Sequence, residues 1–214
     1  MQTNETKITT ADPSALGLFG LAMVTLVASS QKLGLTTGTS LIIPWSFFLG
    51  ASAQLIAGIL DSKRNNVFGT TVFTSYGLFW LGVTMTWMIN LGVFGEGMAN
   101  NIDIRQLGFA FIGYFIFSLI ITIGSMKTNK VLFIDFILID LLFLGLSLST
   151  VWGIEAGHTL AAYSELLISI VTFYAFAATI LNTLYEKVLL PVGKPFNVFK
   201  DSSATIVEKE SKAA

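Results

Sequence analysis

The sequence contains no cysteine and only one histidine, His158. Without cysteine there can be no disulfide bond and no thiolate chemistry, and a single histidine excludes the metal sites that are built on several histidines. Charged residues are also scarce, at 12% of the 214 residues, whereas soluble domains have about 25%. Because 53% of the residues are apolar, this composition indicates a polytopic membrane protein.

Common enzyme motifs are absent as well. The sequence has no His-Glu-x-x-His zinc helix, no Gly-x-Ser-x-Gly elbow and no glycine-rich phosphate loop that ends in lysine. A serine–histidine centre would have to use His158, which we expect on an outer loop. We therefore expect no enzyme, no metal and no cofactor, and the net charge of −1 gives no reason to expect a nucleic-acid partner.

Six apolar runs have the length of about 20 residues that is needed to span the hydrocarbon of a membrane. The connections between them are short, which favours helices that run alternately up and down. The sequence thus predicts an all-α integral membrane fold with six transmembrane helices. The runs are approximately Leu16–Leu35, Leu41–Leu60, Val67–Val93, Leu107–Met126, Val131–Trp152 and Leu160–Tyr185.

Lysine and arginine are distributed unevenly between the two sides of this predicted bundle. Ten lie on the side of the two termini, and the other side has only Lys32 and Arg105. The positive-inside rule then predicts that both termini are cytoplasmic. We expect three parts: a polar arm over residues 1–11 that is not a signal peptide, a transport domain over 12–192, and a polar, disordered tail over 193–214.

The first apolar run opens with features of a helix that can face an anion. Asp12 is a good N-cap, because its carboxylate can accept backbone N–H groups of the first turn. Pro13 suits the first helical position, and Gly17 leaves the turn without bulk. The N-terminus of such a helix carries unpaired N–H groups and positive dipole density, which would favour a small anion.

Polar side chains in the second and third runs are candidates for a pathway. Gly50, Gln54 and Gly58 share a face of the second run, and small residues there can serve packing between helices alone. The amide of Gln54 needs partners or water near the middle of the membrane. In the third run, the hydroxyl of Thr74 can bond back to its own helix, whereas the hydroxyl of Tyr76 must find a partner if it is deep.

Two aspartates lie in the fifth run. If that helix begins near Lys130, a rise of about 1.5 Å per residue puts Asp135 roughly 7 Å and Asp140 roughly 15 Å into the membrane. Carboxyl groups at such depth are costly and mark function by default. We interpret Asp140 as a possible proton site; a neutral acid that makes a hydrogen bond between helices is the alternative. Glu165 is expected at the outer interface, with Glu155 and His158 in the loop before it.

Four blocks of the sequence match known family motifs in order, from about residue 12 to residue 193. They are Asp12-Pro13-Ser14-Ala15-Leu16-Gly17-Leu18, then Ala53-Gln54-Leu55-Ile56-Ala57-Gly58, then Phe73-Thr74-Ser75-Tyr76-Gly77-Leu78-Phe79-Trp80, and finally Leu181-Asn182 with Leu190-Pro191-Val192-Gly193. Through these blocks the chain resembles the acetate uptake transporter family, also called the succinate–acetate permeases.

The resemblance implies a ring-shaped homohexamer in which each subunit has its own pathway for acetate and, in some members, succinate. It also implies an apolar constriction made by helices 1, 3 and 5, which ungapped matching places at Leu21, Tyr76 and Ile139. A position on helix 6 that is tied to substrate size corresponds to Thr172. Asp140 lies beside Ile139, which fits a proton site or a carboxyl packed behind the constriction.

Residues and resemblance together predict a transporter or channel of the plasma or inner membrane for acetate and related small carboxylates, proton-coupled or passive. The alternative is a structural membrane protein whose small-residue faces serve assembly alone, which would leave Gln54 and Asp140 unexplained. The expected pathway residues are Asp12, Leu16, Gly17, Leu21, Gln54, Thr74, Tyr76, Ile139 and Thr172.

Overall fold

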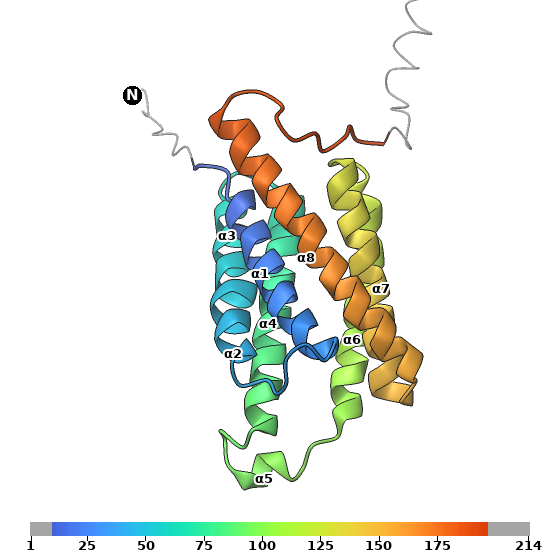
Figure 1. Cartoon of the computed structure of the whole chain (residues 1–214). Helices are drawn as coiled ribbons and strands as arrows, with labels where there is room; N and C mark the ends of the chain where they lie inside the picture. Colours follow the sequence, from blue (N-terminus) through green and yellow to red (C-terminus); the bar gives the residue numbers. More distant parts are fainter. Residues whose placement is uncertain (1–9, 197–214) are drawn as a thin grey trace, which may run out of the picture.

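A computed structural model describes residues 10–196, which form helices and their connections (Figure 1). The helices are α1 (Ser14–Lys32), α2 (Ile42–Trp45), η1 (Ser46–Ala53), α3 (Gln54–Ser62), α4 (Val67–Asn90), α5 (Glu96–Ala99), α6 (Ile104–Ser125), α7 (Lys130–Trp152) and α8 (Glu155–Leu184). Six helical stretches are long and apolar enough to cross a membrane, since α2, η1 and α3 together make one of them. The prediction of six spanning helices is therefore confirmed.

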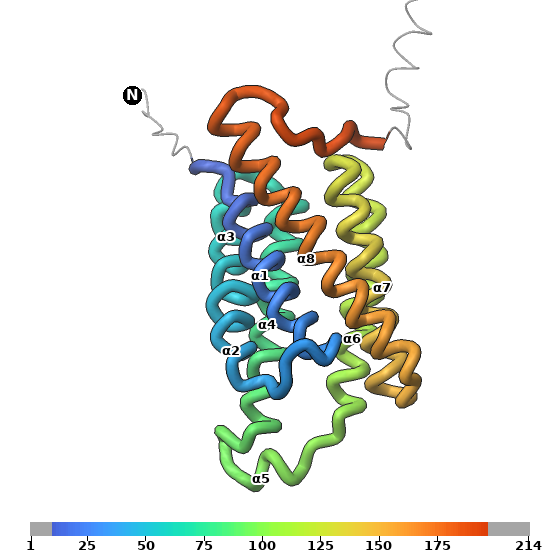
Figure 2. Tube along the Cα trace, viewed as in Figure 1, coloured from blue at the N-terminus to red at the C-terminus, as the bar shows by residue number. Residues whose placement is uncertain are grey.

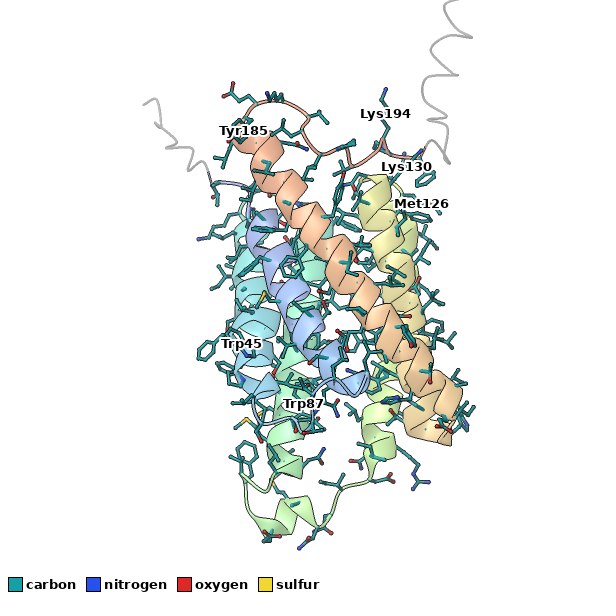
Figure 3. The ribbon with its side chains drawn as sticks, viewed as in Figure 1. Trp45, Trp87, Met126, Lys130, Tyr185 and Lys194 are labelled. Atoms are coloured by element: carbon teal, nitrogen blue, oxygen red, sulfur yellow. The ribbon has the colours of Figure 1, made fainter. Side chains whose placement is uncertain are left out.

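The helices run alternately up and down, and the chain follows this course in Figure 2. The start of α1 and the end of α8 lie at one end of the bundle, which we call the terminus end. The short helix α5 lies at the opposite end, which we call the α5 end. Figure 3 shows Met126, Lys130, Tyr185 and Lys194 near the terminus end, and Trp45 and Trp87 in the half toward the α5 end.

Capping side chains explain where several helices begin. Asn66 accepts a hydrogen bond from the N–H of Gly69 at the start of α4 (3.1 Å), and Asn129 accepts one from Leu132 at the start of α7 (3.0 Å). Asparagine is a favoured N-cap because its side-chain oxygen satisfies an N–H group that has no partner within the helix.

The second membrane span changes its backbone geometry along its length. It begins as the short helix α2, continues as the π-helical η1 and becomes the α-helix α3 at Gln54. Small residues let η1 approach its neighbours: a side-chain carbon on Gly50 would crowd Trp80 of α4, and one on Gly20 of α1 would collide with the carbonyl oxygen of Leu49. π-Helical turns often accompany functional sites, and this one ends directly before a buried glutamine.

The six spans pack around a common interior. α8 packs along both α1 and α7, α7 also packs on α6, and α4 packs on α3 and η1. Aromatic side chains fill the space between α4 and α6, where Phe79 and Tyr114 have ring centroids 4.9 Å apart. The hydroxyl of Tyr114 also donates to the carbonyl oxygen of Ser75 (2.9 Å). The ring of helices is therefore closed by side chains at this point.

One expectation about the start of the sixth span is corrected. α8 begins at Glu155 rather than near Leu160, so Glu155 and His158 belong to its first turn and not to a loop. Polar residues can extend a helix beyond the hydrocarbon because the water there hydrates them. Glu165 is buried between helices, with 2% exposure.

The described chain beyond α8 is held against the terminus end. The amide of Asn182 donates to Leu190 O and accepts from the backbone N–H groups of Leu189 and Leu190. The N–H of Phe196 donates to the carbonyl oxygen of Met126 (2.9 Å). The packed part thus reaches Phe196, four residues past the expected boundary at 192, and the rest of the expected tail and the arm before residue 10 lie outside the described residues.

A close contact between α7 and α8 depends on two glycines. A side-chain carbon on Gly145 would lie 2.6 Å from the carbonyl oxygen of Gly157 and 2.7 Å from the N–H nitrogen of Ala161. Because both obstacles are backbone atoms, the two helices could accommodate a side chain only by moving apart.

We predict that Gly145→Val lowers the free energy of unfolding by about 2–3 kcal/mol through overpacking. Gly113→Ala on α6 is the matched control, because it faces open space and should stabilise the helix by about 0.5–1 kcal/mol. Thermal unfolding in detergent measures both variants. A Gly145→Val variant that unfolds at the wild-type temperature would contradict this account of the contact.

Candidate functional site

A cavity of about 220 Å³ lies inside the bundle and reaches the terminus end. Four helical spans contribute to its wall: α1, α4 and α7 each with residues at helical spacing, and the second span with Gln54 alone. The lining residues are Ser14, Leu18, Leu21, Gln54, Asn66, Phe68, Gly69, Val72, Phe73, Tyr76, Thr128, Leu132, Asp135, Phe136 and Ile139. The wall is therefore mainly apolar, with a few polar groups, as is typical of sites for small molecules.

A second, much smaller cavity of about 20 Å³ lies deeper in the bundle. Three residues line both cavities, namely Leu21 of α1, Tyr76 of α4 and Ile139 of α7. These are the residues that the family resemblance assigned to the constriction. Since they border both spaces, their side chains separate the larger cavity from the smaller one.

Aromatic packing fixes the ring of Tyr76. It stacks on Phe143 with an interplanar angle of 9° and ring centroids 6.2 Å apart, and it meets Phe117 edge-on at 5.6 Å. It also stacks near Phe136 of the cavity wall at 6.4 Å. Contacts of this kind restrain a ring beyond simple burial, so the position of the Tyr76 ring is set by α6 and α7 as well as by its own helix.

Two buried polar atoms of the lining residues have no hydrogen-bond partner among the described residues. They are Nε2 of Gln54, whose residue is 1% exposed, and the hydroxyl oxygen of Tyr76, whose residue is 4% exposed. A buried donor without a partner is costly. Both groups can donate a hydrogen bond, and the hydroxyl of Tyr76 lies close to that of Ser118 on α6.

Asp135 is the acidic residue in the cavity wall. It is 2% exposed, and the hydroxyl of Thr172 on α8 lies 3.1 and 3.0 Å from its two carboxyl oxygens. Thr172 is itself fully buried. Thr172, which the resemblance associated with substrate size, thus meets the cavity through Asp135 rather than as a lining residue.

Asp140 lies elsewhere. It is half-buried between α6 and α7, where its carboxyl oxygen accepts a hydrogen bond from the hydroxyl of Thr122 (2.7 Å). Asp140 is absent from the wall of either cavity described above. The periodicity of a helix explains the difference: Asp135 and Ile139 are four residues apart and share a face, whereas the next residue is turned away by about 100°.

The remaining expected pathway residues lie outside the cavity wall. Leu16 is exposed on the surface of α1, at 39%. Gly17 supports the wall indirectly, because a side chain there would collide with the ring of Phe73. Thr74 packs against Gly58 between α3 and α4. Sequence reasoning did not single out Phe73 or Asn66 as lining residues, although the spacing of Asn66, Phe73 and Tyr76 on one helical face could have indicated them.

The sequence predicts Asp12 as the N-cap of α1 and Pro13 as its first helical residue, but the structure has Pro13 at the N-cap, and α1 begins at Ser14. The carboxylate of Asp12 accepts the N–H of Ser14 (2.9 Å) and pairs with the guanidinium of Arg64 (2.9 Å). Arg64 also approaches the buried Asp61 (3.6 Å). Partial burial raises the pKa of Asp12, but the hydrogen bonds from Ser14 and Arg64 outweigh this and hold the pKa below its usual value. One N–H group at the start of α1 is therefore already occupied by a protein anion.

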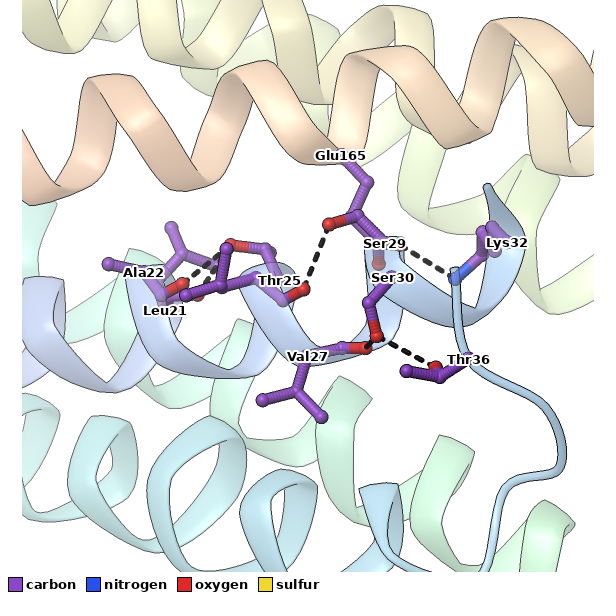
Figure 4. A network of polar contacts seen from close by, with 10 residues as sticks. Leu21, Ala22, Thr25, Val27, Ser29, Ser30, Lys32, Thr36 and Glu165 are labelled. Carbon is purple, nitrogen blue, oxygen red and sulfur yellow. Dashed lines mark hydrogen bonds and ion pairs between the residues drawn. The ribbon is translucent and has the colours of Figure 1, made fainter. Parts of the chain in front are cut away.

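A buried ion pair joins α1 to α8 toward the α5 end (Figure 4). Nζ of Lys32 lies 2.8 Å from a carboxyl oxygen of Glu165, and the two side chains are 16% and 2% exposed. Nearby, the hydroxyl groups of Ser30 and Thr36 are 2.9 Å apart, which ties the end of α1 to the following loop. The ion pair explains how the bundle accommodates a carboxylate at a buried position of α8.

Because a buried charge without a partner is costly, we predict that Glu165→Leu lowers the free energy of unfolding by about 2–4 kcal/mol. The double variant Lys32→Met/Glu165→Leu should recover most of that loss, since apolar replacement of both partners is often neutral. Thermal unfolding of the wild type, both single variants and the double variant gives the coupling free energy. A double variant no more stable than Glu165→Leu would contradict the pairing.

Comparisons with known proteins agree with this fold. A model of the GPR1/FUN34/yaaH family matches residues 2–194. The chain is 30% identical over 184 residues to the succinate-acetate/proton symporter SatP of Escherichia coli K12, covering 86% of this chain and 96% of that protein. The solved structure of the bacterial acetate channel SatP superposes with a TM-score of 0.80 at 29% identity, covering 86% of this chain and all of that one.

Two fungal relatives match over part of their length. One is acetate permease A of Emericella nidulans, 28% identical over 155 residues, which are 69% of this chain and 52% of the relative. The other is ammonia transport outward protein 2 of Saccharomyces cerevisiae, 32% identical over 155 residues, which are 71% of this chain and 54% of the relative.

Proposed function

The chain belongs to the GPR1/FUN34/yaaH family, and we propose on that premise that it passes acetate and closely related small carboxylates across a cell membrane. This is a transporter family and not an enzyme family. SatP is named for succinate and acetate and acetate permease A for acetate, whereas one yeast relative is named for outward transport of ammonia. Small carboxylates are therefore the substrate class that this chain is expected to share.

The observation that carries the proposal is the pair of cavities that meet at Leu21, Tyr76 and Ile139. The larger cavity has the size for one small organic anion, and Gln54 and Tyr76 bring donors that lack partners among the described residues. An anion that leaves water loses its hydrogen bonds, and buried donors compensate for that loss. Both features support a route for a small carboxylate through the middle of the subunit.

We also propose that the terminus end faces the cytoplasm. In the described chain, Lys63, Arg64, Lys127, Lys130, Lys187 and Lys194 lie on that side, and Lys32 and Arg105 lie on the other. This asymmetry follows the positive-inside rule. The larger cavity would then communicate with the cytoplasm, and the constriction would separate it from the outer side.

The homohexamer that the family resemblance implies is part of the proposal. α6 supports it with an exposed apolar surface, which includes Phe109, Ile116, Ile120 and Ile123. Such a surface can face either lipid or a neighbouring subunit. Native mass spectrometry of the purified protein in detergent distinguishes the two, because a hexamer has six times the 23.2 kDa mass of the chain.

The competing possibility is a structural membrane protein without transport activity. The glycine contacts between helices would serve assembly equally well, since small residues drive helix packing in lipid. A purely structural bundle has no use for buried donors without partners beside a cavity, because each of them reduces stability. The lining residues therefore favour transport over assembly alone.

Uptake of radiolabelled acetate into proteoliposomes tests the proposed function. Protein-free liposomes give the background of acetic acid that crosses the bilayer unaided. We expect uptake above that background, and unlabelled acetate and succinate should compete with it. Uptake equal to the background, with folded protein and at every imposed gradient, would instead favour the structural protein.

A variant pair locates the route. We predict that Ile139→Phe slows acetate uptake about five- to a hundredfold, because overpacking costs about 1–3 kcal/mol at the point where the cavities meet. Ile137→Phe is the matched control, since Ile137 is 38% exposed on the same helix, and it should transport like the wild type. Equal rates in both variants would place the route elsewhere.

A further inference from the structure

We propose that Asp135 binds the transported carboxylate through one shared proton, so that each carboxylate enters the cavity together with a proton. The inference rests on the proposed function and adds to it the residue that would make passage electrically neutral. It assigns the proton site to Asp135. The sequence had suggested Asp140 instead, because Asp140 is next to Ile139 of the constriction.

The first step of the argument is proximity. Asp135 lines the same cavity of about 220 Å³ as Gln54 and Tyr76, so a carboxylate bound there shares this space with the Asp135 carboxyl. Two ionised carboxylates at about 5 Å, with an effective dielectric constant of about 20, repel each other enough to weaken binding by about two orders of magnitude. A pair that shares one proton avoids this repulsion, as paired carboxyl groups in other sites do.

The second step concerns the charges around Asp135. Among the described residues, the cavity wall has no lysine, arginine or histidine, and its other titratable side chain is Tyr76 of α4. On α8, Thr172 contacts Asp135 through its hydroxyl. A carboxylate ligand would therefore meet no cation in this wall to offset the charge of Asp135.

Several charged groups of the surrounding elements are engaged elsewhere. Lys32 of α1 and Glu165 of α8 pair with each other toward the α5 end. Arg64, two residues before Asn66 of the wall, is held by Asp12 and by Asp61 of α3. Lys130 at the start of α7 lies over the ring of Phe196, Asp140 is bonded by Thr122 of α6, and Arg105 of α6 pairs with Asp103 at the far end.

The proton follows a balanced course. The protonated Asp135 donates its hydrogen to one oxygen of the carboxylate, in the cavity that Gln54 and Tyr76 also line. When the substrate leaves, the O–H bond of Asp135 breaks and the substrate takes the proton as a neutral acid. The next carboxylate then brings one proton with it through the constriction, and this proton restores the protonated Asp135. One anion and one proton have moved together, and no net charge has crossed.

Thr172 is a positioning residue in this scheme. Its hydroxyl lies within 3.1 Å of both Asp135 oxygens, which keeps the carboxyl group against α8 and leaves its remaining lone pairs for the cavity. Thr172→Ser retains the hydroxyl and should keep the wild-type pH profile of uptake. Thr172→Ala removes it and should shift that profile while passage continues, which a role in packing alone would not produce.

The decisive experiment measures how acetate uptake into proteoliposomes depends on an imposed potassium diffusion potential, with protein-free liposomes subtracted. We expect wild-type uptake to be independent of potential and to rise with an inward proton gradient. Asp135→Asn cannot carry the proton but keeps a polar group, so it should pass the anion alone. About 60 mV should then change its accumulation of acetate about tenfold, and the effect of the proton gradient should disappear.

Asp140→Asn is the matched control on the same helix and should behave like the wild type. Potential-dependent uptake by the wild type, or an Asp135→Asn variant that is folded but either inactive or unchanged, would overturn the assignment to Asp135 and leave the proposed function standing. Failure of the proposed function is a separate result, in which the wild type shows no uptake under any gradient. Uptake of labelled methylammonium that requires Asp135 would also overturn the inference, because it would make Asp135 a cation site.

Discussion

Polar side chains inside a membrane bundle must find partners within the bundle, because lipid supplies none. Several buried polar groups of this protein obey that constraint in pairs that join two helices. Thr172 meets Asp135 between α8 and α7, Thr122 meets Asp140 between α6 and α7, and Lys32 meets Glu165 between α1 and α8. Against this background, Gln54 and Tyr76 stand out, since both line one cavity and both have polar atoms that lack partners among the described residues.

Packing of glycines and aromatic side chains between the helices determines where Gln54 and Tyr76 lie. Glycines allow α7 and α8 to touch backbone to backbone, and aromatic rings close the space between α4 and α6. The same aromatic cluster holds Tyr76 at the meeting point of the two cavities, with Leu21 and Ile139 opposite. The site is therefore a property of helix packing, and several residues far from the cavity contribute to its shape.

Much of the fold could be predicted from the sequence, because about 20 apolar residues in a row have few alternatives to a spanning helix. The site was harder to predict from the sequence than the fold. Depth alone favoured Asp140, whereas the four-residue spacing between Asp135 and Ile139 places Asp135 on the cavity face. The pairing of Glu165 with Lys32 could not be anticipated, since it joins positions 133 residues apart and depends on how α1 crosses α8. The start of α8 at Glu155 was missed because polar residues extend the helix beyond the hydrocarbon.

The most direct test of a carboxylate site in this cavity is a crystal structure of the protein with bromoacetate, whose bromine can be located by its anomalous scattering. The account predicts a bromine peak inside the cavity of about 220 Å³, with the carboxylate within hydrogen-bond distance of Gln54 Nε2, the Tyr76 hydroxyl and the Asp135 carboxyl. A peak confined to the separate space lined by Asn90, Asn101 and Gln106 near the α5 end, with none beside Asp135, would contradict it.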